Sequence, residues 1–367
     1  ILFLIIGGCD SNQIWIDKTK TFELLYEEGK FIQAKVIAEE ALQIAREGYK
    51  DDNLNIISSH INLGKACVAN GDLRAGQENY SIARKIIETE YNNDHWLYAV
   101  ISNQLGMLQY LQGDYKKALE HLDSAHQYWI SNEVLNSKDY TETLETIAHV
   151  KYLTNDLAKA EEYYRKSLDV RQKHLVNRQN EIAQCMNNLA AILRIMGNLI
   201  ESERYTIQSL EIWGNIYGDN HEKIGIGLNN LGVLYKYQGR YNEADSVLSK
   251  AVLINENNLG FNHPDLAPDY NNMAQLYHTM GRKKEADKYF TKAIDILIQY
   301  DEYNYECGQV LANKAEFYFQ TGDYKNAMEC ITKSIQLISK SEVQHKLPII
   351  KKLEERRTQI ELIMSYK

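Results

Sequence analysis

Histidine and cysteine are the side chains of this chain that could bind a metal ion or serve as a base or nucleophile. The sequence contains ten histidines and five cysteines. His121 and His126 are separated by five positions, which puts them on poorly matched faces of a helix. No metalloprotease helix motif, Walker loop, nucleophile elbow or Cys-x-x-Cys pair occurs anywhere. The sequence therefore predicts a protein without a metal site, without a cofactor and without enzymatic activity.

A turn recurs eight times along the chain, and its period explains three of the histidines. The turn residues are Gly29, Gly71, Gly113, Asn155, Gly197, Gly239, Gly281 and Gly322. They are 42 residues apart, except for a last interval of 41. Such a period is typical of a solenoid whose units are each too small to bury their own apolar face. His95, His221 and His263 each lie 24 residues after a turn, so we interpret them as repeat positions in the loop that opens the next unit.

Composition favours one elongated helical domain. The 367 residues include only three prolines, with 44% hydrophobic and 25% charged residues, which permits long helices. The formal net charge of -9 provides no basic surface for phosphate groups, so we expect no nucleic acid partner. A basic or amphipathic peptide is easier to accommodate.

The unit around Gly239 shows how the two helices of a repeat would pack. Counting from the turn, it has Gly232 at −7, Tyr235 at −4, Ala244 at +5, Leu248 at +9 and Ala251 at +12. Small residues at −7, +5 and +12 let two antiparallel helices approach closely, and larger apolar residues fill the space between them. Position +12 is Ala or Ser in all eight units. Phe22 at −7 is an exception in the first unit, and terminal repeats are expected to be atypical.

These offsets resemble the tetratricopeptide repeat, although the period alone also suits HEAT and armadillo repeats. The segments that carry the resemblance are NNLGVLY from Asn229, GRYNEAD from Gly239, LGFNHPDLAPDYNNMAQLY from Leu259 and GRKKEAD from Gly281. They are similar to the arrays of kinesin light chains and their bacterial relatives. The resemblance implies an all-α fold, a right-handed superhelix (α-solenoid) of about eight 42-residue helix-turn-helix repeats over residues 15–343. It also implies a groove that binds a protein or peptide.

By the same resemblance, the first helix of each repeat lines the concave groove through positions −13, −10, −6, −3 and −2. Position −10 holds the asparagines Asn103, Asn187, Asn229 and Asn271. Each amide offers a donor and an acceptor to the backbone of an extended peptide. Position −3 holds Tyr110, Tyr152, Arg194, Lys236 and His278, and position −6 holds His149 and Gln275. The two consecutive cations could receive a carboxylate, and the alternative is that all these residues are merely solvated.

A second series of asparagines, Asn62, Asn188, Asn230, Asn272 and Asn313, occupies position −9. We expect these side chains to face the adjacent helix and to hold the backbone between repeats.

The N-terminal residues differ from the repeats. An apolar run from Ile1 to Ile6 ends at Gly7, Gly8 and Cys9, without an initiator Met. Ile6 to Cys9 resembles the end of a bacterial lipoprotein signal peptide, in which the cysteine is lipidated. We therefore expect residues 1–9 to be a signal remnant, residues 10–14 a short linker, and the protein to be lipid-anchored at the bacterial envelope, facing the periplasm or the surface. The alternatives are a truncated signal anchor, a cleaved secretory signal, or a cytoplasmic location if the motif is misread.

Four further cysteines, Cys67, Cys185, Cys307 and Cys330, are predicted to be buried free thiols. Cys307 and Cys330 are offset by roughly 10 Å along their helix pair, beyond the separation of about 7 Å that a disulfide tolerates. Cys67 and Cys185 belong to repeats two and five, which do not touch in a linear stack. Free thiols disfavour an oxidising compartment, which conflicts with export.

The tail over residues 344–367 departs from the repeat. Pro348 can open a helix, and Ile350, Leu353, Ile360 and Met364 give that helix an apolar stripe. The tail is either a helix that caps the last repeat or a lead into a further module. The sequence thus favours a non-enzymatic scaffold, and the alternative is a regulatory portion of a larger signalling or protease-like protein.

Overall fold

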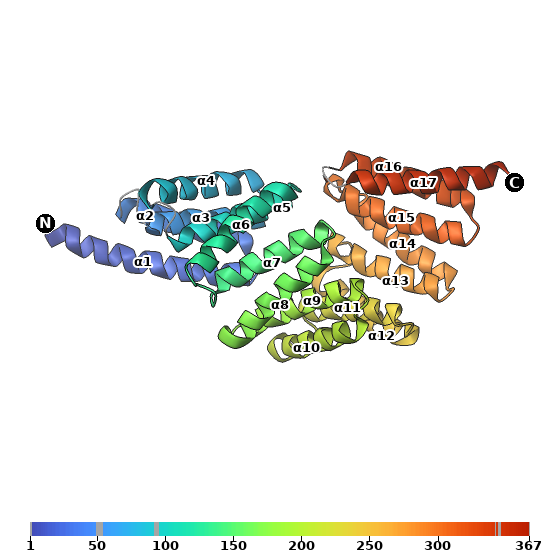
Figure 1. Cartoon of the computed structure of the whole chain (residues 1–367), viewed down its shortest axis with the longest axis horizontal. Coiled ribbons are helices and arrows are strands. Elements are labelled where there is room, and N and C mark those ends of the chain that lie inside the picture. The colour runs from blue at the N-terminus through green and yellow to red at the C-terminus, as the bar shows by residue number, and fades with distance from the viewer. Residues whose placement is uncertain (1, 49–53, 92–94, 342, 344–345, 367) are drawn as a thin grey trace. The chain divides into compact units, whose positions relative to one another are not determined.

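The computed structural model describes residues 2–48, 54–91, 95–341, 343 and 346–366, with side chains from residue 11 onward. Most of these residues are helical, and none of them belongs to a strand. The helices form two units, residues 1–175 and 176–367 (Figure 1).

The described residues of unit 1 form four helix pairs. They are α1 (Leu2–Glu27) with α2 (Phe31–Gly48), α3 (Leu54–Ala69) with α4 (Leu73–Glu90), α5 (Trp96–Leu111) with α6 (Tyr115–Ser131), and α7 (Lys138–Leu153) with α8 (Leu157–His174).

In unit 2, the part of the chain that the structure describes forms four further pairs and a last helix. They are α9 (Gln179–Ile195) with α10 (Leu199–Tyr217), α11 (Glu222–Tyr237) with α12 (Tyr241–Leu259), α13 (Ala267–Thr279) with α14 (Lys283–Leu297), α15 (Asn304–Gln320) with α16 (Tyr324–Lys340), and α17 (Lys346–Ser365). Two short 3-10 helices, η1 (Pro264–Leu266) and η2 (Asp301–Tyr303), precede α13 and α15. All eight predicted turns separate the two helices of a pair, which confirms the repeat.

The turn residue ends the first helix in a left-handed conformation. The turn glycines have φ between 73° and 84°, and Asn155 has φ of 62°. At Gly71, the Gly71 amide donates to the Val68 carbonyl and the Asp72 amide donates to the Cys67 carbonyl, each at 2.9 Å. This is a Schellman ending, which satisfies carbonyls that have no partner inside the helix. Asp72 then accepts from the Ala75 amide and caps the next helix.

Within a repeat, the small residue at −7 packs under the large residue at +9, as predicted. A Cβ atom on Gly64 would lie 2.4 Å from the Tyr80 ring, and one on Gly232 would lie 2.4 Å from Leu248. These distances are too short for any side chain other than hydrogen. The residues at +12 are also buried in all eight repeats.

In unit 2, an acid at +6 joins one repeat to the next. Asp245 of α12 accepts from the Tyr277 hydroxyl at 2.9 Å and from the Arg282 guanidinium at 3.1 Å. The Arg282 guanidinium also lies 4.2 Å from the centre of the Tyr277 ring, a cation–π distance. The preceding junction repeats the ion pair and the ring contact with Glu203, Arg240 and Tyr235.

The recurring loop histidines are helix N-caps. In His95, His221 and His263, Nδ1 accepts from the backbone amide two residues ahead. This bond needs an unprotonated Nδ1. Burial lowers the pKa of His95, which favours the neutral ring that its cap requires.

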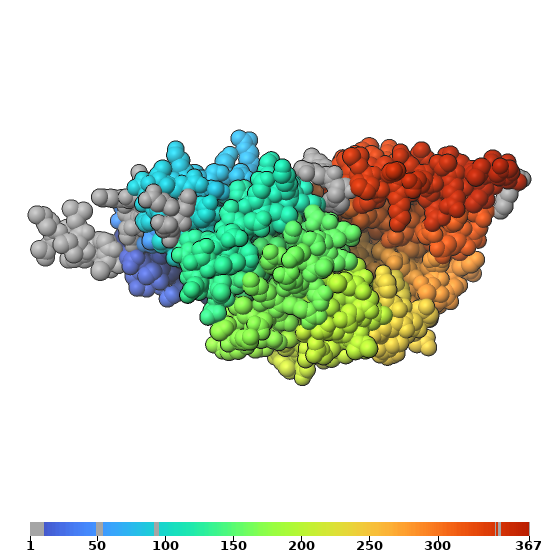
Figure 2. Space-filling model, in the orientation of Figure 1, coloured from blue at the N-terminus to red at the C-terminus, as the bar shows by residue number. Residues whose placement is uncertain are grey.

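The ends of the chain agree with the prediction only in part. Residues 10–14, expected as a linker, belong to α1, because no proline or glycine interrupts the helix between Cys9 and Glu27. At the other end, Ile360 of α17 is buried against the last helix pair, so this helix caps the repeat (Figure 2, red). Among the described residues, no helix is both long and apolar enough to cross a bilayer.

The four described cysteines are free thiols, as expected. Cys67, Cys185 and Cys307 are buried. Cys330, however, is only half-buried, so its expected burial was wrong. Its side chain lines a cavity that the preceding repeat fills with larger residues.

Replacing Asp245 with Ala should lower the free energy of unfolding by about 1–3 kcal/mol, because the buried Tyr277 hydroxyl loses its acceptor. Urea unfolding followed by circular dichroism measures the change. Glu243→Ala on the same helix is the control, since Glu243 is an exposed partner of Arg240 and bonds no tyrosine. Equal effects of the two substitutions would contradict a special role for the Asp245 contact.

Candidate functional site

The residues predicted to line a groove lie on the first helices of the repeats. In unit 2, these helices, α9, α11, α13 and α15, contact one another in order. In unit 1, α3, α5 and α7 do the same. Each unit therefore presents one face made only of first helices, which we call its first-helix face.

Asparagines join the repeats across this face in unit 2. Nδ2 of Asn230 donates to Oδ1 of Asn187 at 3.0 Å, and Nδ2 of Asn272 donates to Oδ1 of Asn229 at 3.1 Å. A third bond of 3.0 Å runs from Nδ2 of Asn313 to Oδ1 of Asn271. In these three cases, the side chain at −9 bonds to the side chain at −10 of the preceding repeat.

These three bonds, which we call the asparagine ladder, correct one expectation from the sequence. The asparagines at −9 were expected to hold backbone atoms, but in these three repeats they bond side-chain oxygens at −10. The −10 oxygens are therefore occupied, whereas the −10 nitrogens are not. Among the residues that the structure describes, no acceptor is bonded to Nδ2 of Asn187, Asn229 or Asn271. What remains for a ligand is a row of donors.

The predicted ladder does not extend evenly into unit 1. Asn103 is only 4% exposed, and its buried Oδ1 has no hydrogen-bond partner in the described chain. The reason is that Thr146 occupies the −9 position of the next repeat and donates to the Glu142 carbonyl instead. Asn187, at 3% exposed, is also largely buried. Only Asn229 and Asn271 are half-buried side chains of the kind that a groove would present.

Sequence reasoning missed what replaces asparagine at −10 in the fourth repeat. Glu145 stands there, and its Oε1 accepts from Arg171 at 2.7 Å and from the Ser167 hydroxyl at 2.6 Å. Arg171 is buried, so this ion pair is part of the packing between α7 and α8. The sequence did contain one indication of this ion pair, since Glu145 interrupts the series of asparagines at −10.

The two predicted cations lie close together on the first-helix face of unit 2. Arg194 of α9 lies 5.3 Å from the centre of the Tyr237 ring, and the Lys236 ammonium lies 5.8 Å from the same centre. Nζ of Lys236 donates to Oε1 of Gln275 at 3.0 Å. Burial and the charge of Arg194 lower the pKa of Lys236 to about 8. Tyr237, at 59% exposed, was not singled out from the sequence, although it occupies the inward position −2.

Lys236 has no counter-charge among the residues that the structure describes. Its partners in the described chain are the Gln275 amide and an aromatic ring, and no carboxylate there lies within ion-pair distance of Nζ. His278, one repeat further along, packs its ring 5.2 Å from Phe317 instead of completing a cation row. Burial lowers the pKa of His278, which favours a neutral ring.

In the third and fourth repeats, which belong to unit 1, aromatic residues occupy position −3. The Tyr110 hydroxyl lies 3.4 Å from Nε2 of His149, and the rings of these residues are 5.2 Å apart. The His149 ring also lies 6.3 Å from Tyr152. As with Lys236 and Gln275, a residue at −3 contacts position −6 of the next repeat. One such contact is therefore present in each unit.

The first-helix face of unit 2 provides amide donors, two cations and an exposed phenol ring. In the described part of the chain, no three His, Cys, Asp or Glu side chains are grouped to hold a metal ion. The arrangement is suited to binding backbone carbonyls and carboxylates. The side chain of Cys9, the predicted lipidation site, lies outside the described residues.

Comparison with solved structures identifies similar helical arrays. The structure of NprR in complex with its cognate peptide NprX is 17% identical, covers 98% of both chains and has a TM-score of 0.62. A Rap protein complexed with competence and sporulation factor is 14% identical, covers 94% of this chain and 99% of its own, and has a TM-score of 0.60. A tetratricopeptide repeat protein from Parabacteroides merdae is 17% identical, covers 82% and 98%, and has a TM-score of 0.56.

Comparison of the sequence gives the family. No curated protein matches the chain. A tetratricopeptide repeat family model matches residues 97–173, 181–252 and 224–299, which together are more than half of the chain. A second tetratricopeptide repeat model matches residues 308–341. The eight helix pairs, their small-residue packing and these matches together show that the chain belongs to the tetratricopeptide repeat family.

Proposed function

We propose that this protein is a non-enzymatic scaffold that binds an extended, acidic peptide segment of a partner on the first-helix face of unit 2. The observation that carries the proposal is the pair of half-buried amide donors at Asn229 and Asn271, to which no acceptor of the described chain is bonded, beside Lys236, which has no carboxylate partner there.

The donors favour a peptide backbone. An extended peptide presents carbonyl oxygens at regular intervals, and each can accept from one amide nitrogen whatever the side chains are. The bonds between repeats hold each −10 amide by its oxygen, which leaves its nitrogen directed away from that bond. Such prior orientation reduces the entropy that a ligand must lose on binding.

The net charge alone favoured a basic or amphipathic peptide, but the local cations Arg194 and Lys236 favour acidic side chains or a C-terminal carboxylate. In a chain of net charge -9, a half-buried lysine next to an arginine is an unfavourable pair, because each charge disfavours the other. A bound carboxylate would offset this repulsion and form charge-assisted hydrogen bonds. The exposed Tyr237 ring beside both cations offers apolar contact for the residue that follows.

The comparisons support a peptide as the ligand. Two of the similar structures are described as complexes, one with a cognate peptide and one with competence and sporulation factor. Their low identity carries the likeness of fold alone, so the choice of residues rests on the geometry of this chain.

We further propose that the scaffold is tethered to the bacterial envelope through a lipid on Cys9. The motif from Ile6 to Cys9 supports this assignment. A lipid at the start of α1 would hold the repeats beside a membrane without a spanning helix.

Substitution can separate the two roles of the −10 amides, because the oxygen bonds the next repeat and the nitrogen is the proposed donor to the ligand. Asn229→Asp with Asn271→Asp keeps the oxygens that accept from Asn272 and Asn313 but removes the nitrogen donors. We expect this double variant to remain folded and to bind a neutral probe, an acetylated and amidated peptide of alternating Gln and Gly, about fivefold more weakly per lost bond. Fluorescence polarisation of the labelled probe measures the affinity.

The matched control removes the other half of each bond. Asn272→Ala with Asn313→Ala keeps the −10 donors, so we expect lower stability in urea with a smaller change in affinity. If the aspartate variant binds the probe as the wild type does, the donor row is not the binding site.

Binding of an acidic probe should depend on pH through Lys236. With a peptide of alternating Glu and Gly, the affinity should fall as the pH rises through about 8, since Lys236 loses its charge there while the glutamates stay ionised. Lys236→Arg should abolish the fall, because a guanidinium stays charged. The Gln and Gly probe is the control. A pH dependence that persists in Lys236→Arg would assign the effect to another group.

Lipid attachment can be read directly from the mature N-terminus. When the full gene is expressed in a bacterium, mass spectrometry should find a chain that begins at Cys9 and carries the mass of a lipid. Cys9→Ser should remove both the lipid mass and membrane association. Recovery of Ile1, or of an unmodified Cys9, would rule out the anchor.

A further inference from the structure

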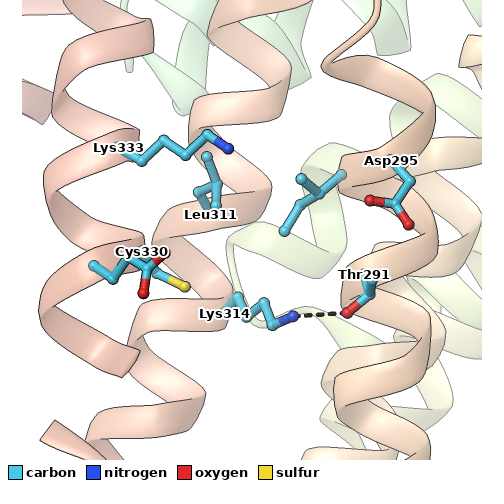
Figure 3. Close-up of a pocket in the computed structure, with 8 residues that line it drawn as sticks. Thr291, Asp295, Leu311, Lys314, Cys330 and Lys333 are labelled. Carbon is cyan, nitrogen blue, oxygen red and sulfur yellow. Dashed lines mark hydrogen bonds between the residues drawn. The ribbon is translucent and has the colours of Figure 1, made fainter. Parts of the chain in front are cut away.

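A cavity of about 180 Å³ lies among α14, α15 and α16 of unit 2, and none of its lining residues is among those assigned to peptide binding. Ile294, Leu311 and Cys330 provide its apolar lining. Thr291, Lys314 and Lys333 provide polar atoms. Figure 3 shows the Lys314 side chain extending from α15 toward Thr291 of α14. None of these side chains was singled out as a binding residue from the sequence.

The repeat itself explains why this cavity exists. One repeat earlier, the positions −11 and +8 hold Tyr270 and Tyr289, whose ring centres are 5.9 Å apart. The same positions in the last repeat hold Leu311 and Cys330. Replacing two phenol rings with a leucine and a thiol removes the atoms that fill the junction. The cavity therefore corresponds to the volume that two aromatic rings fill in the preceding repeat.

The surroundings of those rings are partly retained. In the earlier repeat, the Lys292 ammonium lies 4.7 Å from the centre of the Tyr270 ring and 5.6 Å from that of Tyr289. Its counterpart at +11 is Lys333, which lines the cavity. A ring in the cavity would thus meet a cation, as the two tyrosines do.

A polar contact is added where the earlier repeat has a buried methionine. Lys314 takes the place of Met273, and its ammonium donates to the Thr291 hydroxyl at 2.7 Å and lies 3.1 Å from Asp287. An ammonium has three donors, so one remains for an oxygen inside the cavity. Asp295 and Glu329 also line the cavity, so together with Asp287 three carboxylates accompany the two lysines. This excess of negative charge disfavours an anionic ligand, and a neutral one avoids the repulsion.

We propose that this cavity is a binding site for a small neutral phenol with a single ring. Apolar cavities of about 150 Å³ in other proteins accept benzene, so the volume is sufficient for one ring. The ring would contact Ile294, Leu311 and Cys330, and its hydroxyl would accept from Lys314. Burial raises the pKa of the Cys330 thiol to about 11, so this wall of the cavity stays uncharged at neutral pH.

The test uses p-cresol, which has the structure of a tyrosine side chain, and the full chain. Isothermal titration should show saturable binding at one site. Cys330→Tyr restores the residue of the earlier repeat and should weaken binding by more than about tenfold, because its ring occupies the space. Gln336→Tyr adds a tyrosine to an exposed position of the same helix and should leave the affinity unchanged.

Two further measurements keep the outcome decisive. If Cys330→Tyr loses its helical circular dichroism signal, Leu311→Tyr replaces it as the filling variant. 4-Methylcyclohexanol, of similar size but without an aromatic face, should bind more weakly than p-cresol. No saturable binding by the wild type, or equal binding by a folded filling variant, would overturn the proposal. The peptide-binding face plays no part in this test, so either proposal can fail alone.

Discussion

The close approach of the two helices in each repeat is the constraint on which the rest of the structure depends. Gly64 and Gly232 show it directly, since neither position has room for a Cβ atom. Because the pair must meet along small residues at −7 and +12, its orientation fixes which side of the first helix points away from the second. The positions at −10, −6 and −3 acquire their common face in this way.

Stacking then adds two kinds of contact between repeats, which involve different helices. On the side of the second helices, acids such as Asp245 hold a tyrosine and an arginine of the next repeat. On the first-helix face, asparagine amides bond one another. An amide has more hydrogen-bonding capacity than one such bond uses. The same side chain can therefore join repeats through its oxygen and present its nitrogen to a ligand.

Much of this architecture was predictable from the sequence because each helix pair uses local rules. The period, the eight turns, the packing of −7 under +9 and the buried series at +12 depend on residues within one repeat. The direction of the asparagine bonds was not predictable, because it depends on how the next repeat is placed. The same reason applies to Asn103, whose missing partner follows from Thr146 in another repeat. Glu145 differs, because its partner Arg171 lies on the second helix of the same repeat, and the pattern of the other repeats did not indicate that pair.

The candidate sites lie where a repeat departs from its neighbours. At −3, Tyr110 and Tyr152 are followed by Arg194 and Lys236 in the next two repeats. At +8, Tyr289 is followed by Cys330, which turns a filled junction into a cavity. A substitution that leaves a cavity costs stability, because the lining atoms lose their contacts. The cavity nevertheless has a lysine where the earlier repeat has a buried methionine. Burying a cation without compensating hydrogen bonds or a counter-charge lowers stability further. Lys314 offsets part of that cost through Thr291 and Asp287, and a ligand oxygen would offset more. The preceding repeat is thus the structural comparison for the last one, because Tyr270 and Tyr289 fill the volume that is a cavity beside Leu311 and Cys330.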